Sequence, residues 1–272
     1  MALREIHPSL LLSLRFGIGG VLLLLVQLRN DRRFLRAFSS KDWLTIVFLA
    51  IVGISGHGLL QAYGLLYTTA INTGWIVATM PVFITVAARF YLREPITPRK
   101  IGGILLSFLG IFLVISKGVY SISLFHVRST FGDFLILTSA LTWTAFTVGG
   151  REFVSRFSPL AAITPIMIVG CLTTLPFTWV KWEWNLLFHL SIFTWAGVLF
   201  LGIFCSGFAY LFWYAALQKK DSSVVGMYLY LEPFVTLIGA GAFLGEEIRW
   251  ITLAGGGMTL VGVYLATRKV PR

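Results

Sequence analysis

The chain has 272 residues, of which 57% are hydrophobic and only 12% are charged, with a mean hydropathy of +0.84. Soluble domains average about 25% charged residues, so this composition excludes an ordinary water-soluble protein. The net charge of +11 is spread over short polar stretches, which favours contact with lipid headgroups over nucleic-acid binding. Cys171 and Cys205 lie inside apolar runs and predict neither a disulfide nor a metal site.

Long apolar runs fill most of the chain. A helix needs about 20 apolar residues to cross the hydrocarbon core of a bilayer. We find nine such runs, at 8–28, 43–65, 73–92, 99–117, 131–150, 159–180, 193–217, 222–244 and 248–267. They lack the alternation of barrel strands. The sequence therefore predicts an all-α integral membrane protein of nine transmembrane helices, with no space for a soluble domain.

Basic residues are distributed unevenly between alternate loops. The first loop carries Arg29, Arg32, Arg33 and Arg36, whereas the loop at 67–72 carries none. Continuing alternately, most of the 22 Lys and Arg residues fall on the side of the first loop. Because short loops rich in Lys and Arg stay in the cytoplasm, we expect a cytoplasmic C-terminus.

Two parts of the chain repeat. Residues 61–117 align without a gap with 213–269, matching Gly74 with Gly226, Pro81 with Pro233, Glu94 with Glu246, Gly103 with Gly255, and Gly110 with Gly262. The loop before the Pro81 helix is neutral, whereas Lys219 and Lys220 precede the Pro233 helix. The second copy is therefore expected to be inverted. Inverted repeats are typical of secondary transporters, with the site near the midplane; duplication without transport is the alternative.

Close packing is also expected within the repeat. Gly103 with Ser107, and Gly255 with Thr259, have the small-xxx-small spacing that lets helices approach closely.

The repeat divides the chain into halves at 1–118 and 131–268. The second half has five spans and the first has four. Arg4-Glu5 before Pro8 resembles Arg151-Glu152 before Pro159, so we expect the counterpart of span 131–150 to be missing before Met1. An apolar run encoded just upstream would support truncation, and its absence would support loss.

These features, taken in order, resemble the EamA family of the drug/metabolite transporter superfamily. The residues that carry the resemblance are Pro8 to Leu11 with Arg15 and Phe16; Tyr63 to Ala70; Met80 to Phe83 with Glu94; Gly132 and Asp133 with Ala140 to Trp143; Tyr214 to Leu217; and Glu232 and Pro233 with Gly245 and Glu246. The resemblance implies ten helices in two inverted five-helix halves, of which this chain lacks the first. It also implies transport of small metabolites, often outward, and a place in the bacterial inner membrane.

Two charged residues, Arg15 and Glu232, lie well inside predicted spans, away from the charges near the span ends. Placing a charge near the centre of a span costs free energy, about 2.5–3.5 kcal/mol on scales from membrane-insertion experiments. Glu232 is a candidate for proton coupling or cation binding in a cavity, or else a structural carboxylate beside a carbonyl that Pro233 frees. Arg15 either extends to the outer interface, pairs with Glu232, or binds an anionic group of the substrate.

His57 and Gln61 share one face of a predicted span. The glycines on both sides of His57 thin the helix and suggest a cavity wall, and its titration range suits proton coupling. A simple hydrogen bond to a carbonyl is the alternative.

Aromatic residues complete the candidate substrate site: Trp75, Trp143, Tyr210, Tyr214, Tyr228 and Tyr230. Trp143 lies near a span centre, where its N–H needs a partner, whereas Trp75 fits an interfacial belt as well. Pro81 and Pro233 are candidate kinks, for gating or packing. Asp133 is expected to cap a helix rather than contact substrate, and Glu94 and Glu246 are also expected to be caps.

The sequence thus favours a secondary transporter, an exporter of a small metabolite such as an amino acid or nucleobase-like compound. It would work by alternating access between the halves, with the bilayer and substrate as partners, protons as a candidate coupling ion, and no cofactor. An intramembrane enzyme is the alternative, but no catalytic or phosphate-binding motif supports it. A non-transporting membrane protein remains a second alternative.

Overall fold

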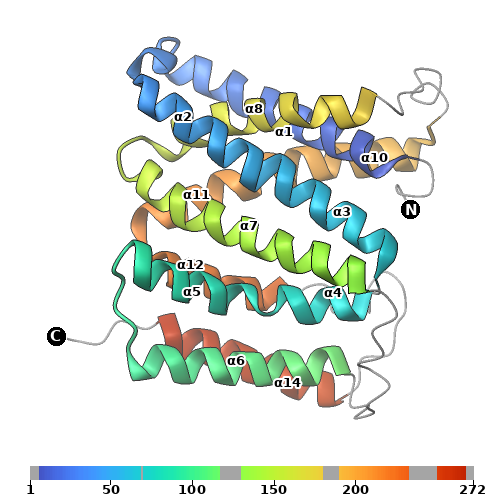
Figure 1. The fold of residues 1–272 in the computed structure, drawn as a ribbon, viewed down its shortest axis with the longest axis vertical. Coiled ribbons are helices and arrows are strands. Elements are labelled where there is room, and N and C mark those ends of the chain that lie inside the picture. The colour runs from blue at the N-terminus through green and yellow to red at the C-terminus, as the bar shows by residue number, and fades with distance from the viewer. Residues whose placement is uncertain (1–5, 69, 117–129, 180–189, 233–249, 268–272) are drawn as a thin grey trace. The chain divides into compact units, whose positions relative to one another are not determined.

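The computed structural model describes residues 6–68, 70–116, 130–179, 190–232 and 250–267, and all regular structure within these ranges is helical (Figure 1). Each of the nine predicted spans contains helix. The first half supplies α1 (Pro8–Asn30), η2 (Phe34–Ala37), α2 (Ser40–Leu49), η3 (Ala50–Gly56), α3 (His57–Tyr67), α4 (Ala70–Val77), α5 (Met80–Tyr91) and α6 (Pro98–Ser116). The second supplies α7 (Thr130–Val154), α8 (Pro159–Trp179), α10 (Ile192–Phe200), η5 (Leu201–Phe208), α11 (Ala209–Lys219), α12 (Ser222–Met227), η6 (Tyr228–Leu231) and α14 (Trp250–Thr267).

Five continuous helices in the described ranges are long and apolar enough to cross a membrane. They are Pro8–Asn30, Ser40–Tyr67, Phe131–Val154, Pro159–Trp179 and Ile192–Lys219. Their ends lie within a few residues of the predicted ones, because polar caps mark where apolar runs begin. Ser39 and Asp42 form a capping box at α2, with Asp42 N–H donating to Ser39 Oγ at 3.3 Å. Ser191 Oγ accepts from Thr194 N–H at 3.2 Å and starts α10.

Two of these long helices contain a π-helical segment. In one, η3 joins α2 to α3; in the other, η5 joins α10 to α11. A π segment widens a helical turn by one residue, and such segments are frequent at functional sites. Each of the two carries a Ser-Gly pair, Ser55-Gly56 in η3 and Ser206-Gly207 in η5. The two long helices therefore share a backbone irregularity that hydropathy did not predict.

The contacts divide the chain into two compact units. Unit 1 consists of Met1–Tyr63 and Ala145–Lys219, and unit 2 of Gly64–Thr144 and Lys220–Arg272. Each unit draws on both of the predicted halves, 1–118 and 131–268, so the contact units follow a different division from the sequence repeat.

In unit 1, α1 packs against α8 and η5, while α8 packs against η3 (Figure 1). A glycine mediates each contact with a π segment. An added Cβ on Gly19 of α1 would lie 3.0 Å from the carbonyl oxygen of Gly202 in η5. A Cβ on Gly170 of α8 would lie 2.4 Å from Ile54 Cγ2 in η3. Gly19 and Gly170 stand at the same distance from the first residue of their helices, so this packing is repeated within the unit.

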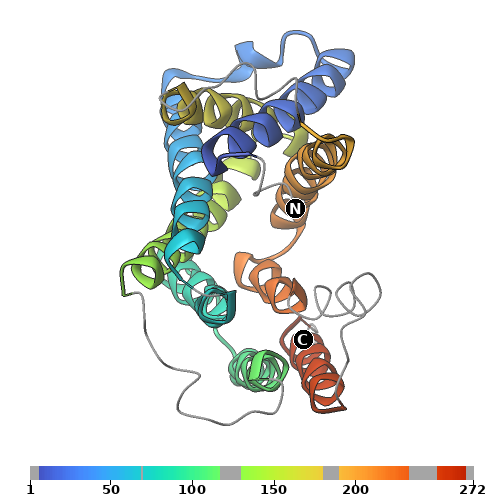
Figure 2. The ribbon, with the colours of Figure 1, turned by 90° about the vertical axis from the view of Figure 1, so that its right-hand side faces the viewer.

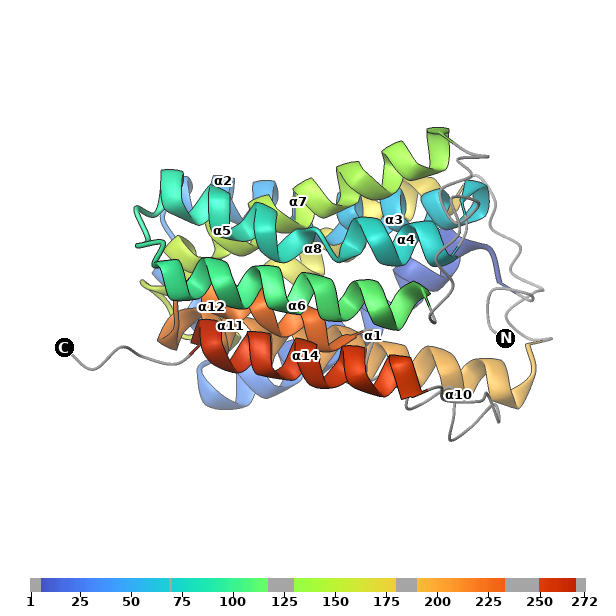
Figure 3. The same cartoon turned by 90° about the horizontal axis from the view of Figure 1, so that it is seen from below.

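In unit 2, α6 and α14 lie side by side, as Figure 2 shows end-on and Figure 3 along their length. A Cβ on Gly103 would lie 2.6 Å from the Gly262 carbonyl oxygen, and one on Gly110 would lie 2.5 Å from that of Gly255. Between these contacts, Ser107 Oγ donates to the Thr259 carbonyl at 3.2 Å. The helices run antiparallel, and the residues of the predicted small-xxx-small spacing make the contact.

The predicted span 73–92 is interrupted in the structure. α4 ends at Val77 and α5 begins at Met80, with Pro81 in its first turn. Proline fits the first turn of a helix because its missing N–H has no partner to lose there. The expected kink at Pro81 is thus a break between two helices.

Glu94 caps a helix, as expected, but one that is distant in the sequence. Its carboxylate accepts from the Ser222 N–H at 2.6 Å and the Ser223 N–H at 3.1 Å, at the start of α12. Lys100 Nζ donates to Ser223 Oγ at 2.7 Å. Asp133, in the first turn of α7, accepts a hydrogen bond from the Thr68 hydroxyl, so it joins the start of α7 to the end of α3.

Candidate functional site

The charge of Arg15 lies inside the apolar helix α1, and η5 supplies its partner. Arg15 is half-buried, and its Nε donates to Ser206 Oγ at 2.9 Å. A Cβ on Gly202 would lie 3.3 Å from the Arg15 carbonyl oxygen, so this glycine lets the backbone of α1 approach the π segment. The Arg15 guanidinium also lies 5.1 Å from the centroid of the Phe16 ring.

Aromatic rings continue from this pair across unit 1. The Phe16 ring lies 6.4 Å from that of Tyr210, Tyr210 lies 5.9 Å from Phe146, and Phe146 lies 5.4 Å from Tyr214, measured between centroids. All four side chains are buried. We call Arg15, Ser206 and these four aromatic residues the Arg15 cluster.

Tyr214 gives the cluster one buried polar atom without a partner among the described residues. The residue is fully buried, and its hydroxyl has no hydrogen-bond partner in the described part of the chain. It lies against Gly150 of α7, where an added Cβ would be 2.6 Å from the hydroxyl oxygen. Buried polar atoms normally have partners, and exceptions are often found where water or a ligand binds.

His57 and Gln61 belong to the same unit. His57 is buried and begins α3 directly after η3, and Gln61 is half-buried one turn further on. Gly58 lies against Phe16, with 3.2 Å between its added Cβ and Phe16 Cε2. The structure therefore places the start of α3 beside the Arg15 cluster.

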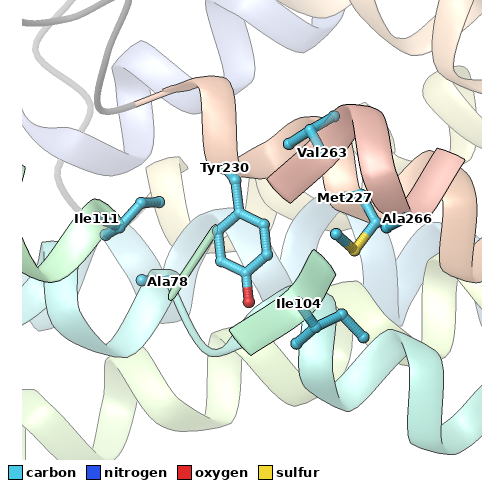
Figure 4. Packing of buried hydrophobic residues seen from close by; sticks show 7 residues of the cluster. All are labelled: Ala78, Ile104, Ile111, Met227, Tyr230, Val263 and Ala266. Atoms are coloured by element: carbon cyan, nitrogen blue, oxygen red, sulfur yellow. The ribbon is translucent and has the colours of Figure 1, made fainter. Parts of the chain in front are cut away.

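Other candidate residues lie in unit 2. Trp143 is half-buried in α7, and Tyr228 is 50% exposed in η6. Tyr230 is fully buried in an apolar cluster with Ala78, Ile104, Ile111, Met227, Val263 and Ala266, shown in Figure 4. Its hydroxyl has no hydrogen-bond partner among the described residues.

The remaining candidates are only partly described. Glu232 follows η6 and has an exposed side chain. The backbone of Trp75 lies in α4, whereas its side chain, Pro233 and Glu246 lie outside the described residues. Among the described residues, no group of three or more His, Cys, Asp or Glu side chains is placed to hold a metal ion.

Sequence reasoning missed Ser206, Phe16 and Phe146. Ser206 lies 191 residues from its partner Arg15, a distance that no local pattern spans. The signal that could have found it is the Ser-Gly pair, which occurs once in each of the two corresponding long helices.

Comparisons with known proteins agree with this fold. The EamA-like transporter family matches residues 1–116 and 130–268. An uncharacterized transporter of Archaeoglobus fulgidus is 33% identical over 270 residues, covering 99% of this chain and 91% of the relative. The uncharacterized transporter YyaM of Bacillus subtilis is 27% identical over 261 residues, covering 96% and 84%. One solved crystal structure has a TM-score of 0.77 and 18% identity, covering 96% of this chain and 89% of that one.

The long apolar helices and these relatives define a multi-pass membrane transporter rather than an enzyme. The chain belongs to the EamA-like transporter family of the drug/metabolite transporter superfamily. The predicted family and broad class of function are confirmed.

Proposed function

We propose that this transporter is a secondary exporter of a small metabolite, such as an amino acid or a nucleobase-like compound. It works by alternating access between the inverted halves 1–118 and 131–268, in a cell inner membrane. The antiparallel contact of α6 and α14 carries this proposal. Equivalent residues of the two copies, Ser107 and Thr259, meet there in opposite directions, as an inverted repeat requires, and inverted repeats are typical of secondary transporters.

The Arg15 cluster supports the location of the substrate. Arg15 provides a charge, while Tyr210 and Tyr214 provide aromatic surface and hydroxyl groups. We further propose that His57, Gln61, Trp75, Trp143, Tyr228 and Tyr230 contribute to substrate binding, and that Pro81 and Pro233 serve in gating.

Counterflow tests the function directly. The purified protein is reconstituted into liposomes, which are loaded with unlabelled amino acids or nucleobases. These liposomes are expected to accumulate the labelled form of at least one compound, whereas loaded liposomes without the protein are not. Equal uptake by both across the whole panel would contradict the proposal. Inside-out vesicles, compared with right-side-out ones, then test the outward direction.

Glu232 is proposed as the proton-coupling group. A Glu232→Gln variant cannot release a proton at this position, so we expect transport by the variant to lose its dependence on a pH gradient. Transport by Glu232→Gln with an unchanged pH dependence would exclude this role.

The orientation is a separate proposal. Because Lys and Arg gather on one side of the sequence, we propose a cytoplasmic C-terminus. A C-terminal fusion to a fluorescent protein that folds only in the cytoplasm should be bright, and a fusion to alkaline phosphatase should be inactive. The reverse pattern would contradict the orientation.

A further inference from the structure

The guanidinium of Arg15 has N–H donors without an acceptor in the described part of unit 1. Within the described part of unit 1, no carboxylate forms an ion pair with it; the ion pair recorded there joins Arg156 to Asp42 at 2.6 Å. An arginine is charged at all physiological pH values and carries five N–H donors. Ser206 takes the Nε donor, which leaves the two terminal nitrogens, the part that binds anions in a bidentate manner.

The hydroxyl of Ser206 can also donate a hydrogen bond. It is fully buried and accepts from Arg15, and its own hydroxyl proton has no acceptor in the described part of the chain. Ser55, the corresponding residue of η3, is different: its hydroxyl donates to the Ala50 carbonyl at 3.1 Å and lies 2.6 Å from Thr173 Oγ1. The hydroxyl proton of Ser206 thus has no acceptor among the described residues, while the hydroxyl of Ser55 is bonded within the protein.

The side chains around Arg15 and Ser206 indicate what kind of molecule carries the anionic group. Phe16 is buried beside Arg15, and the Tyr210 ring stands edge-on to it at an interplanar angle of 85°. Apolar ring surface favours an aromatic or other apolar body. A single cation matches one negative charge, because a phosphate dianion requires more positive charge than one guanidinium offers.

We propose that Arg15 and Ser206 bind the carboxylate of a small aromatic or apolar monocarboxylate. Two guanidinium N–H groups and the Ser206 hydroxyl donate to the carboxylate oxygens, and Phe16 and Tyr210 contact the apolar body. This inference rests on the proposed transport function, since it names the class of substrate for the same site.

Thermal unfolding of the purified protein in detergent tests the site without a known substrate. The probes are phenylacetate and its neutral isostere phenylacetamide, which differ in the negative charge. Phenylacetate is expected to raise the Tm at concentrations where phenylacetamide does not, because only the carboxylate can pair with the guanidinium. Equal shifts by both probes would overturn the proposal. So would no shift by phenylacetate up to about 10 mM, which is about ten times the Kd of a weak ligand that binds at about 1 mM.

Variants locate the effect. Arg15→Gln should weaken phenylacetate binding at least about tenfold, since hydrogen bonds to charged groups are worth about 1.5–3 kcal/mol. Arg15→Lys should restore part of the affinity, because it keeps the charge but not the bidentate geometry. Ser206→Ala should weaken binding, while its matched control Ser55→Ala should not. Equal affinities in the two serine variants, or wild-type affinity in Arg15→Gln, would contradict the assignment.

Counterflow separates this inference from the function on which it rests. Counterflow of a nucleobase or an amino acid, without any preference of the protein for phenylacetate over its amide, would keep the transporter and overturn the carboxylate site. A carboxylate-specific Tm shift that Arg15→Gln removes, in a protein that transports nothing in the panel, would keep the site and overturn the function.

Discussion

The two π segments of unit 1 share a π-helical backbone and differ in the chemistry of their side chains. η3 and η5 each interrupt a long helix, carry a Ser-Gly pair and receive a glycine of a neighbouring helix, Gly170 or Gly19. Ser55 of η3 bonds to a threonine hydroxyl, whereas Ser206 of η5 accepts from a guanidinium. The repeat therefore builds the scaffold twice, and one residue, Arg15, gives only one copy a charge.

The largest expected effect comes from filling the glycine contact at η3. In Gly170→Ala, the new methyl would lie 2.4 Å from Ile54 Cγ2 and 2.5 Å from Ile54 Cβ. A β-branched side chain cannot turn away, so we expect a loss of about 1–3 kcal/mol of stability. The Tm in detergent measures it, with Gly197→Ala as the control, because no atom lies within 4 Å of an added Cβ there. An equal Tm for both variants would contradict this packing.

Ser206→Ala is expected to have the next largest effect. It removes the partner of Arg15 Nε and leaves a half-buried charge with one hydrogen bond fewer. Hydrogen bonds to charged groups contribute about 1.5–3 kcal/mol, and solvent access to Arg15 places the loss in the lower part of that range. Ser206→Thr, which keeps the hydroxyl, should retain more of the stability than Ser206→Ala in the same melting experiment. Equal melting of the two would mean that the Arg15 contact contributes nothing.

Gly19→Ala tests whether the glycine contact at η5 is looser than that at η3. The added methyl would lie 3.0 Å from Gly202 O and from Gly207 N. This is tight but wider than the contact at Gly170. A helical Gly→Ala change gains up to about 1 kcal/mol in propensity, so the net loss should stay below about 1 kcal/mol. A lower Tm for Gly19→Ala than for Gly170→Ala would contradict the expectation that the contact at η5 is the looser one.

The smallest effect is expected for Ser55→Ala. This change removes hydrogen bonds between neutral groups, to Thr173 and to the Ala50 carbonyl. Such bonds inside membrane proteins average about 0.6 kcal/mol. The variant should therefore melt close to the wild type and above Ser206→Ala. A loss at Ser55 as large as that at Ser206 would show that the charge of Arg15 adds nothing to the difference between the segments.

Much of the fold could be predicted from the sequence, because apolar length and end caps are local properties. α1 and α8 begin at Pro8 and Pro159, where the predicted spans begin. The contact of Gly103 and Ser107 with α14 followed from their spacing. The π segments could not be predicted in this way, because one extra residue in a helical turn leaves the mean hydropathy unchanged.

The candidate site was predictable only in part. Arg15, Tyr210 and Tyr214 stood out as polar residues in apolar spans, and the structure brings them into one cluster. Their partners did not stand out, since serine and phenylalanine are ordinary residues of a membrane helix and Ser206 is distant in the chain. Tyr230 also stood out in the sequence, and the structure places it among apolar residues of unit 2; its role in substrate binding stays a prediction.

The glycine contacts between α6 and α14 also bear on motion. At Gly103 and Gly110 the backbone of α6 lies directly against carbonyl oxygens of α14. A slide of one helix along the other would take the glycines of α6 out of register with the carbonyl oxygens of α14 and break this close packing. The pair is therefore expected to translate and tilt as a single rod.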